Sequence, residues 1–247
     1  MSNPALTERT FRAAGRAESA DAAMTLHGTL VKTGILTLLL VVAGAVSWQA
    51  VRAENALWVP MFLGGCLGGL AVALLTVFVP RLSPWTAPLY AALEGLALGV
   101  ISAVTEGVFN GIVFQAVVLT VSVLGVMLLL YLTRVIQPTR RFAIAVVSAT
   151  CAVFLFYLVA MVLALCGVGV SFIHEMLYGN GVLGVGFSLL VVGIAALNLI
   201  LDFGLIESGV AAGAPKYMEW YGGFSLLVTL VWLYLEILRL LAKLRSR

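Results

Sequence analysis

Long uninterrupted apolar runs dominate this sequence, and they restrict its fold more than any other feature. Of the 247 residues, 62% are hydrophobic and only 10% are charged. A helix needs about 20 apolar residues, at 1.5 Å per residue, to cross a hydrocarbon core of roughly 30 Å. The sequence contains seven such runs, at about 30–50, 57–79, 87–108, 111–132, 142–167, 181–203 and 221–243.

These runs predict helices that span a membrane. They are continuous and rich in Leu, Val and Ala, whereas the strands of a membrane barrel alternate between apolar and polar residues over about 10 positions. The expected fold class is therefore an all-α, polytopic integral membrane protein. We expect a polar tail over residues 1–29 and a single transmembrane domain over residues 30–247. Because about 29 polar residues precede the first run, we expect no cleavable signal peptide.

The distribution of basic residues predicts the orientation. With seven spans, nine Lys and Arg residues lie on the side of the N-terminus and five on the other side. The positive-inside rule then favours a cytoplasmic N-terminus and places the C-terminus on the far side. The basic C-terminal segment, which begins at Lys243, opposes this placement. Six spans with one re-entrant segment are the alternative that would resolve the conflict.

Small residues recur at helical spacing in two of the runs. Ala91, Gly95, Gly99 and Ala103 follow one another at intervals of four, and the second run contains Gly64, Gly65, Gly68 and Gly69. Such faces let helix backbones approach closely in lipid, so we expect tight packing at both. Glu94 lies beside the first face and is therefore expected to point into the bundle.

Three carboxylates, Glu94, Asp202 and Glu236, lie in or at the ends of apolar runs. A charge at the centre of a bilayer costs roughly 2.5–3.5 kcal/mol on insertion scales, so these residues are candidates for ion or proton sensing. Helix rise places Glu94 about 9 Å into the third run, on the side where Asp202 ends the sixth run. Glu236 is expected about 22 Å across the last run, towards the opposite face.

Each carboxylate also has a structural explanation. Arg239 follows Glu236 by three residues and can form a local ion pair with it. Asp202 can be a polar residue at a helix end, whereas Glu94 has no basic residue in its own run. If two of these groups adjoin in a poorly solvated site, they cannot both ionise easily. They would then form a proton-sensitive gate or a cation site.

Motifs for catalysis or for cofactor binding are incomplete. His174 and Glu175 begin a zinc-protease motif, but Tyr178 occupies the position of the second histidine ligand. The Asp202-Phe203-Gly204 triplet lacks the other kinase motifs. We therefore expect no enzymatic activity, no catalytic residue, no metal site and no cofactor. The basic residues are juxtamembrane, which indicates contact with the lipid bilayer and not with nucleic acid.

Several segments resemble the Bax inhibitor-1 family. The last two helices of that family are similar to LNLILDF at 197–203, APKYMEWY at 214–221 and LYLEILRLL at 233–241. Its bacterial subgroup is similar to NPAL at 3–6, MTLHGT at 24–29 and APLYAALEG at 87–95. The resemblance implies a seven-helix bundle with the last helix at the centre. It also implies a calcium leak that responds to pH through two aspartates, one at the end of the sixth helix and one in the seventh.

Asp202 matches the first of these aspartates, but the second has no counterpart. Its position falls at 227–229, where Thr229 ends a stretch without an acidic residue. Glu236, two turns further along the helix, and Glu94, at the level of Thr229 on another helix, are both possible replacements. Thr229 and Arg239 would then lie next to the sensing carboxylates.

The resemblance therefore leaves two functions open. The first is a pH-sensitive cation leak channel or transporter in the bacterial inner membrane, with calcium or protons as its partners. The second is a non-transporting regulator of membrane partners, such as a membrane-bound protease, for which the tail and the segment 204–220 would be docking surfaces.

Overall fold

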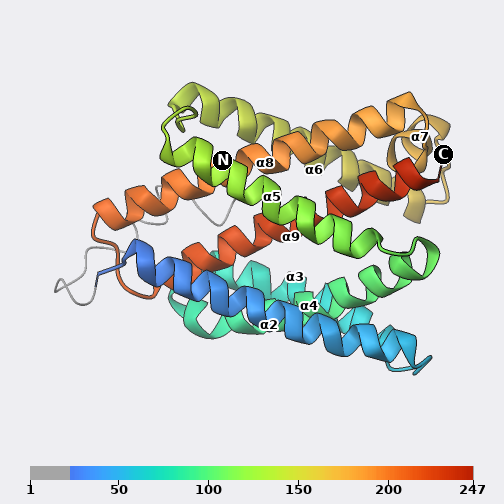
Figure 1. Cartoon of the computed structure of the whole chain (residues 1–247), viewed down its shortest axis with the longest axis horizontal. Coiled ribbons are helices and arrows are strands. Elements are labelled where there is room, and N and C mark those ends of the chain that lie inside the picture. Colours follow the sequence, from blue (N-terminus) through green and yellow to red (C-terminus); the bar gives the residue numbers. More distant parts are fainter. Residues whose placement is uncertain (1–22, 247) are drawn as a thin grey trace. The chain divides into compact units, whose positions relative to one another are not determined.

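The computed structural model describes residues 23–246, and helices make up nearly all of this range (Figure 1). Seven helices are long and apolar enough to span a membrane: α2 (Leu26–Arg52), α3 (Trp58–Phe78), α4 (Ser83–Val108), α5 (Ile112–Leu132), α6 (Arg140–Leu165), α8 (Val182–Ala211) and α9 (Met218–Arg245). The short helices η2 (Pro80–Leu82) and α7 (Ser171–Tyr178) lie in connections, and residues 23–246 contain no β-strand. The expected all-α membrane fold is confirmed.

The first spanning helix begins earlier than the sequence predicted. The Thr25 side chain caps α2 by accepting a hydrogen bond of 2.9 Å from the Gly28 N–H, so the helix starts at Leu26. Residues 1–22 of the expected tail, which include Arg9, Arg12 and Arg16, lie outside the described residues, as does Arg247.

Two other boundaries also differ. The third spanning helix, α4, starts at Ser83 and contains Pro88 in its interior, whereas the sequence predicted a start at about residue 87. The helix α8 does not end near Asp202. It continues to Ala211, beyond the end of the apolar run from which it was predicted. The connection between α8 and α9 is therefore residues 212–217, and not 204–220.

The described chain forms two compact units. The N-terminal unit consists of residues 23–108 and 202–228, and the C-terminal unit consists of residues 109–201 and 229–246. The helices α8 and α9 each contribute one part to each unit.

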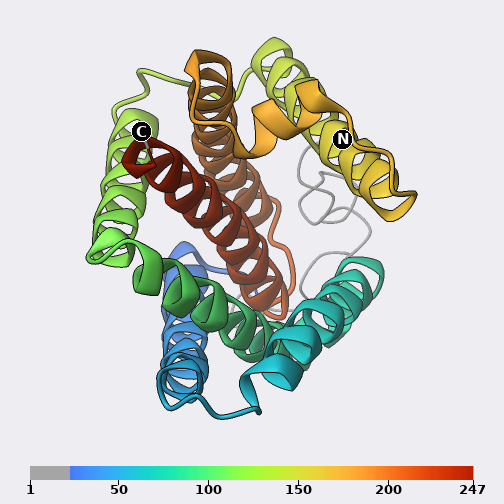
Figure 2. The same ribbon diagram turned by 90° about the vertical axis from the view of Figure 1, so that its right-hand side faces the viewer.

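In the N-terminal unit, α4 lies between α2 and α3 and contacts both through glycine (Figure 2). On one side, Gly95 and Gly99 lie directly against the α2 backbone around Gly44. On the other side, a Cβ at Gly65 would lie 2.6 Å from the Leu93 carbonyl oxygen. Gly68 and Gly69 also face α4, whereas Gly64 faces open space. Tight packing at the two small-residue faces is confirmed, with the exception of Gly64.

The part of α9 in the N-terminal unit is almost completely buried. Tyr221, Phe224 and Leu227 are 0–2% exposed, and the Phe224 ring packs edge-on against Tyr90 of α4 with a centroid separation of 4.9 Å. The neighbouring Gly223 faces Thr33 of α2. Within this unit the last helix therefore has the central position that the resemblance implied.

The remainder of α9 is held within the C-terminal unit by polar contacts near its end. Lys243 Nζ donates hydrogen bonds to the carbonyl oxygens of Met176, in α7, and Gly184, in α8, at 2.7 and 3.0 Å. Arg245 donates to the Asn110 carbonyl oxygen and to Gln115 Oε1 in α5, at 2.6 and 2.9 Å. The end of α9 lies beside α7 in Figure 1, and these bonds connect it to three neighbouring helices.

Adjacent glycines in α3 provide a test of this packing. We expect Gly65→Ala to destabilise the protein by about 1–3 kcal/mol, because the new methyl group would overlap the α4 backbone. Gly64→Ala is the matched control, and it is expected to be neutral or slightly stabilising, because it raises helix propensity in open space. Thermal unfolding in detergent micelles measures both, and equal effects of the two substitutions would contradict the packing described.

Candidate functional site

Glu94 lies on the side of α4 that faces α3. Its side chain is half-buried, and its Oε2 atom would lie 3.0 Å from a Cβ at Gly69. The absence of a side chain at Gly69 therefore provides the space that the carboxylate occupies. As the sequence predicted, Glu94 lies inside the helix packing and adjacent to the small-residue face of α4.

Asp202 is completely buried, with 0% of its surface exposed. It lies within α8 and is flanked by Leu201 and Phe203, which are 3% and 9% exposed. The surrounding protein therefore shields this carboxylate from lipid, as expected of a functional or structurally required acid in a spanning helix.

Glu94 and Asp202 both belong to the N-terminal unit and lie at similar depth. The Ser83 hydroxyl donates a hydrogen bond of 2.9 Å to the Tyr217 carbonyl oxygen, so the start of α4 and the connection after α8 lie on the same side. Glu94 is eleven residues after Ser83, about 16 Å at 1.5 Å per residue, and Asp202 is nine residues before Ala211, about 14 Å.

These depths correct the values estimated from the sequence. Glu94 was expected about 9 Å from the helix end, and Asp202 was expected at the end itself. Because α4 begins before Pro88 and α8 continues beyond Asp202, both residues lie further from their helix ends than the sequence predicted. The expectation that they share a level is retained.

Glu236 belongs to the C-terminal unit and has two polar partners there. It is 2% exposed, and Arg239 Nη1 donates hydrogen bonds of 2.9 and 3.0 Å to its two carboxylate oxygens. The Tyr157 hydroxyl donates a third, at 2.9 Å. The local ion pair that the sequence suggested for Glu236 and Arg239 is therefore present, and Tyr157 of α6 joins it.

Thr229 is also part of the C-terminal unit and is buried, with 4% of its surface exposed. The structure thus places the five sequence-derived site residues in two groups. Glu94 and Asp202 belong to the N-terminal unit, whereas Thr229, Glu236 and Arg239 belong to the C-terminal unit.

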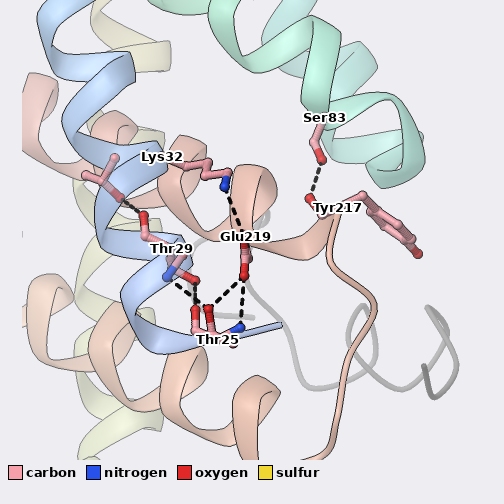
Figure 3. Close-up of polar contacts among 8 residues, drawn as sticks. Thr25, Thr29, Lys32, Ser83, Tyr217 and Glu219 are labelled. Atoms are coloured by element: carbon pink, nitrogen blue, oxygen red, sulfur yellow. Dashed lines mark hydrogen bonds and ion pairs between the residues drawn. The ribbon is translucent and has the colours of Figure 1, made fainter. Parts of the chain in front are cut away.

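Sequence reasoning missed another carboxylate, Glu219, which falls in the segment 204–220 that it had interpreted as a connection. Glu219 lies in the first turn of α9 and is 0% exposed (Figure 3). Its Oε1 atom accepts hydrogen bonds from the N–H and the hydroxyl of Thr25, at 3.1 and 2.9 Å. Its Oε2 atom lies 3.2 Å from Lys32 Nζ. Lys32 was the available signal, because a lone cation inside an apolar run requires a counter-charge.

The described residues contain no group of three or more His, Cys, Asp or Glu side chains that could hold a metal ion. The ionisable groups occur as pairs and small hydrogen-bonded clusters.

Comparison with known families agrees with this architecture. A family model described as Bax inhibitor 1 like matches residues 3–246. The chain belongs to this family. No curated protein and no solved structure matches the chain.

The match to the Bax inhibitor 1 like family covers all the residues that the structure describes, so both compact units belong to it. The resemblance inferred from short segments is therefore confirmed for the whole chain. Membership, together with the seven apolar helices, identifies this Bax inhibitor family protein as a multi-pass membrane protein.

A double-mutant cycle on Glu236 and Arg239 tests the cluster in the C-terminal unit. We expect a coupling free energy of roughly 0.5–3 kcal/mol between Glu236→Gln and Arg239→Gln, because the two side chains touch and Glu236 is buried. Unfolding of the four proteins in mixed micelles gives the four free energies. Additive effects would show that this ion pair contributes nothing to stability.

Proposed function

We propose that this Bax inhibitor family protein is a cation leak channel or transporter, with calcium as the cation, and that protonation of Asp202 and Glu94 controls it. The observation that carries the proposal is the presence of these two carboxylates at the same depth in one compact unit. The family resemblance, which implies a calcium leak governed by two acids, supports it.

The chemistry of the two side chains fits this role. Calcium prefers carboxylate and carbonyl oxygens as ligands, and carboxylates in the interior of a membrane protein commonly mark an ion or proton pathway. Protonation removes the negative charge that attracts a cation. A path lined by Asp202 and Glu94 would therefore conduct a divalent cation when they are ionised and lose this attraction when they are neutral.

Glu94 is the better partner for Asp202 in this proposal. Glu236 already has a cation and a hydroxyl group on its carboxylate, and these contacts reduce its attraction for a passing ion. Glu94 belongs to the same unit as Asp202, is half-buried and lies against Gly69. We therefore assign gating to Asp202 and Glu94, and a structural role to Glu236.

The competing proposal is a regulator of membrane partners, such as a membrane-bound protease, that conducts no ions. In neither proposal is the protein an enzyme. Only the leak channel or transporter predicts ion flux through the purified protein without a partner, so reconstitution separates the two.

The flux prediction uses purified protein in liposomes that contain a calcium dye. We expect calcium flux that depends on pH, and we expect Asp202→Asn and Glu94→Gln each to lower it at least about tenfold, the factor that corresponds to 1.4 kcal/mol. Glu236→Gln, a matched loss of a buried carboxylate, should leave the pH dependence in place. Unchanged flux in both Asp202→Asn and Glu94→Gln would sink the proposed gate, and absence of flux in the wild type would favour the regulator.

We also propose a cytoplasmic N-terminus in a bacterial plasma membrane. The basic residues near the C-terminus opposed a far-side C-terminus, but three of those that the structure describes have partners within the protein. Arg239 pairs with Glu236, Lys243 binds two carbonyl oxygens, and Arg245 binds Asn110 and Gln115. Seven continuous helices, each of 21 residues or more, also favour seven spans over six with a re-entrant segment.

Cysteine labelling of intact cells tests this orientation. In a variant in which Cys66, Cys151 and Cys166 are replaced by alanine, we expect Ala53→Cys to react with a membrane-impermeant maleimide and Ala212→Cys to remain unlabelled. Both positions are exposed, and they lie in connections on opposite sides of the spans. Reaction of Ala212→Cys alone would establish the reverse orientation. Lysed cells, in which both positions should react, are the control.

A further inference from the structure

Hydrogen bonds and an ion pair among three residues connect the start of α2 to the first turn of α9. Glu219 accepts two hydrogen bonds from Thr25 and pairs with Lys32 at 3.2 Å (Figure 3). We call these three residues the Glu219 clamp. Gly28 is part of its construction, because a Cβ at this position would overlap the Glu219 carboxylate. The carboxylate therefore lies directly on the backbone of α2.

Thr25 has two roles in the clamp. Its hydroxyl donates to Glu219 Oε1 and also accepts the hydrogen bond from Gly28 N–H that caps α2. The preceding residue, Met24, donates its N–H to the Ala214 carbonyl oxygen at 2.6 Å, and Ala23 forms an antiparallel bridge with Pro215. The clamp therefore fixes the first turn of α2 and the connection before α9 together.

Beyond the clamp, α2 lies directly against two glycines of α9. Gly222 and Gly223 of α9 face Thr29 and Thr33 of α2, and a Cβ at either glycine would lie 3.1–3.2 Å from them. Because these two positions of α9 are glycines, no α9 side chain interlocks with α2 there. Packed helices can slide past one another at such surfaces when their polar contacts break.

The same surface leads to Asp202. Ile206 of α8 packs at Gly222, where a Cβ would lie 3.4 Å from Ile206 Cγ1. Asp202 is one helical turn before Ile206, and Glu219 is three residues before Gly222. A shift of α2 along α9 would therefore act next to the turn of α8 that carries the proposed gating carboxylate.

We propose that the Glu219 clamp is a conformational device that holds α2 on α9 in the closed state and releases when the cation path opens. The release rests on the proposed function, whereas the holding contact does not. In the closed state Lys32 pairs with Glu219, and its Nζ atom lies over the Trp220 ring, 5.8 Å from the ring centroid. Opening separates Lys32 from Glu219 and further exposes a side chain that is already 23% exposed.

Hydrogen exchange tests the holding contact in full-length protein in lipid nanodiscs. We expect Glu219→Gln and Thr25→Val each to raise the exchange rate of the amides at residues 24–29 about tenfold, because the first replaces the carboxylate that binds Thr25 and Lys32 by a neutral amide and the second removes the hydroxyl that caps α2. Ser83→Ala is the matched control, because it removes the hydrogen bond from α4 to Tyr217 in the same region but leaves the clamp intact. Equal exchange in wild type, Glu219→Gln and Thr25→Val would overturn the proposal.

A reversible crosslink tests the release. Residues opposite each other in an antiparallel bridge have Cα atoms about 4.5–5.5 Å apart, which suits a disulfide. In the background without native cysteines, we expect the oxidised Ala23→Cys/Pro215→Cys variant to conduct calcium at least about tenfold more slowly than its reduced form, because the bond holds the closed population. Ala23→Cys alone should not respond to reduction.

The two experiments separate the clamp from the proposed function. Equal flux in the oxidised and reduced forms, with the crosslink verified by mass spectrometry, would overturn the release. If the wild type conducts no calcium, the proposed function and the release fail together. The exchange experiment still decides whether the clamp holds α2 on α9.

Discussion

The N-terminal unit depends on close backbone contact at glycine. In a bilayer, lipid chains are as apolar as leucine, so helices associate through packing and polar contacts and not through the hydrophobic effect. The α4 helix meets this constraint on two sides, with Gly95 and Gly99 against α2 and with Gly65 and Gly69 of α3 against its other side. The position of Glu94 depends on one of these contacts, because its carboxylate lies against Gly69.

Buried charges are the second constraint, and different groups compensate them. Glu236 and Glu219 each face a basic residue within the same unit, Arg239 and Lys32. Lys243 is instead surrounded by backbone carbonyl oxygens. These arrangements offset the cost of removing a charge from water.

The sequence predicted the spanning helices and their fold class well, because a hydrocarbon core imposes a minimum apolar length. It also predicted the Glu236–Arg239 pair, whose spacing of three residues is local. It failed where helices extend beyond their apolar runs, as α8 does between Asp202 and Ala211. It also missed Glu219, because its partners Thr25 and Lys32 are almost 200 residues away along the chain. Contacts at that separation leave no periodic signal.

The division of the chain has a consequence for biosynthesis. Residues 202–228 complete the N-terminal unit, yet the ribosome makes them after the helices α5 to α7 of the C-terminal unit. During synthesis, α2 to α4 are therefore present in the membrane without their last packing partner. Lys32 lacks its counter-charge until Glu219 emerges. Assembly of the first helices made is thus finished by one of the last segments to be translated.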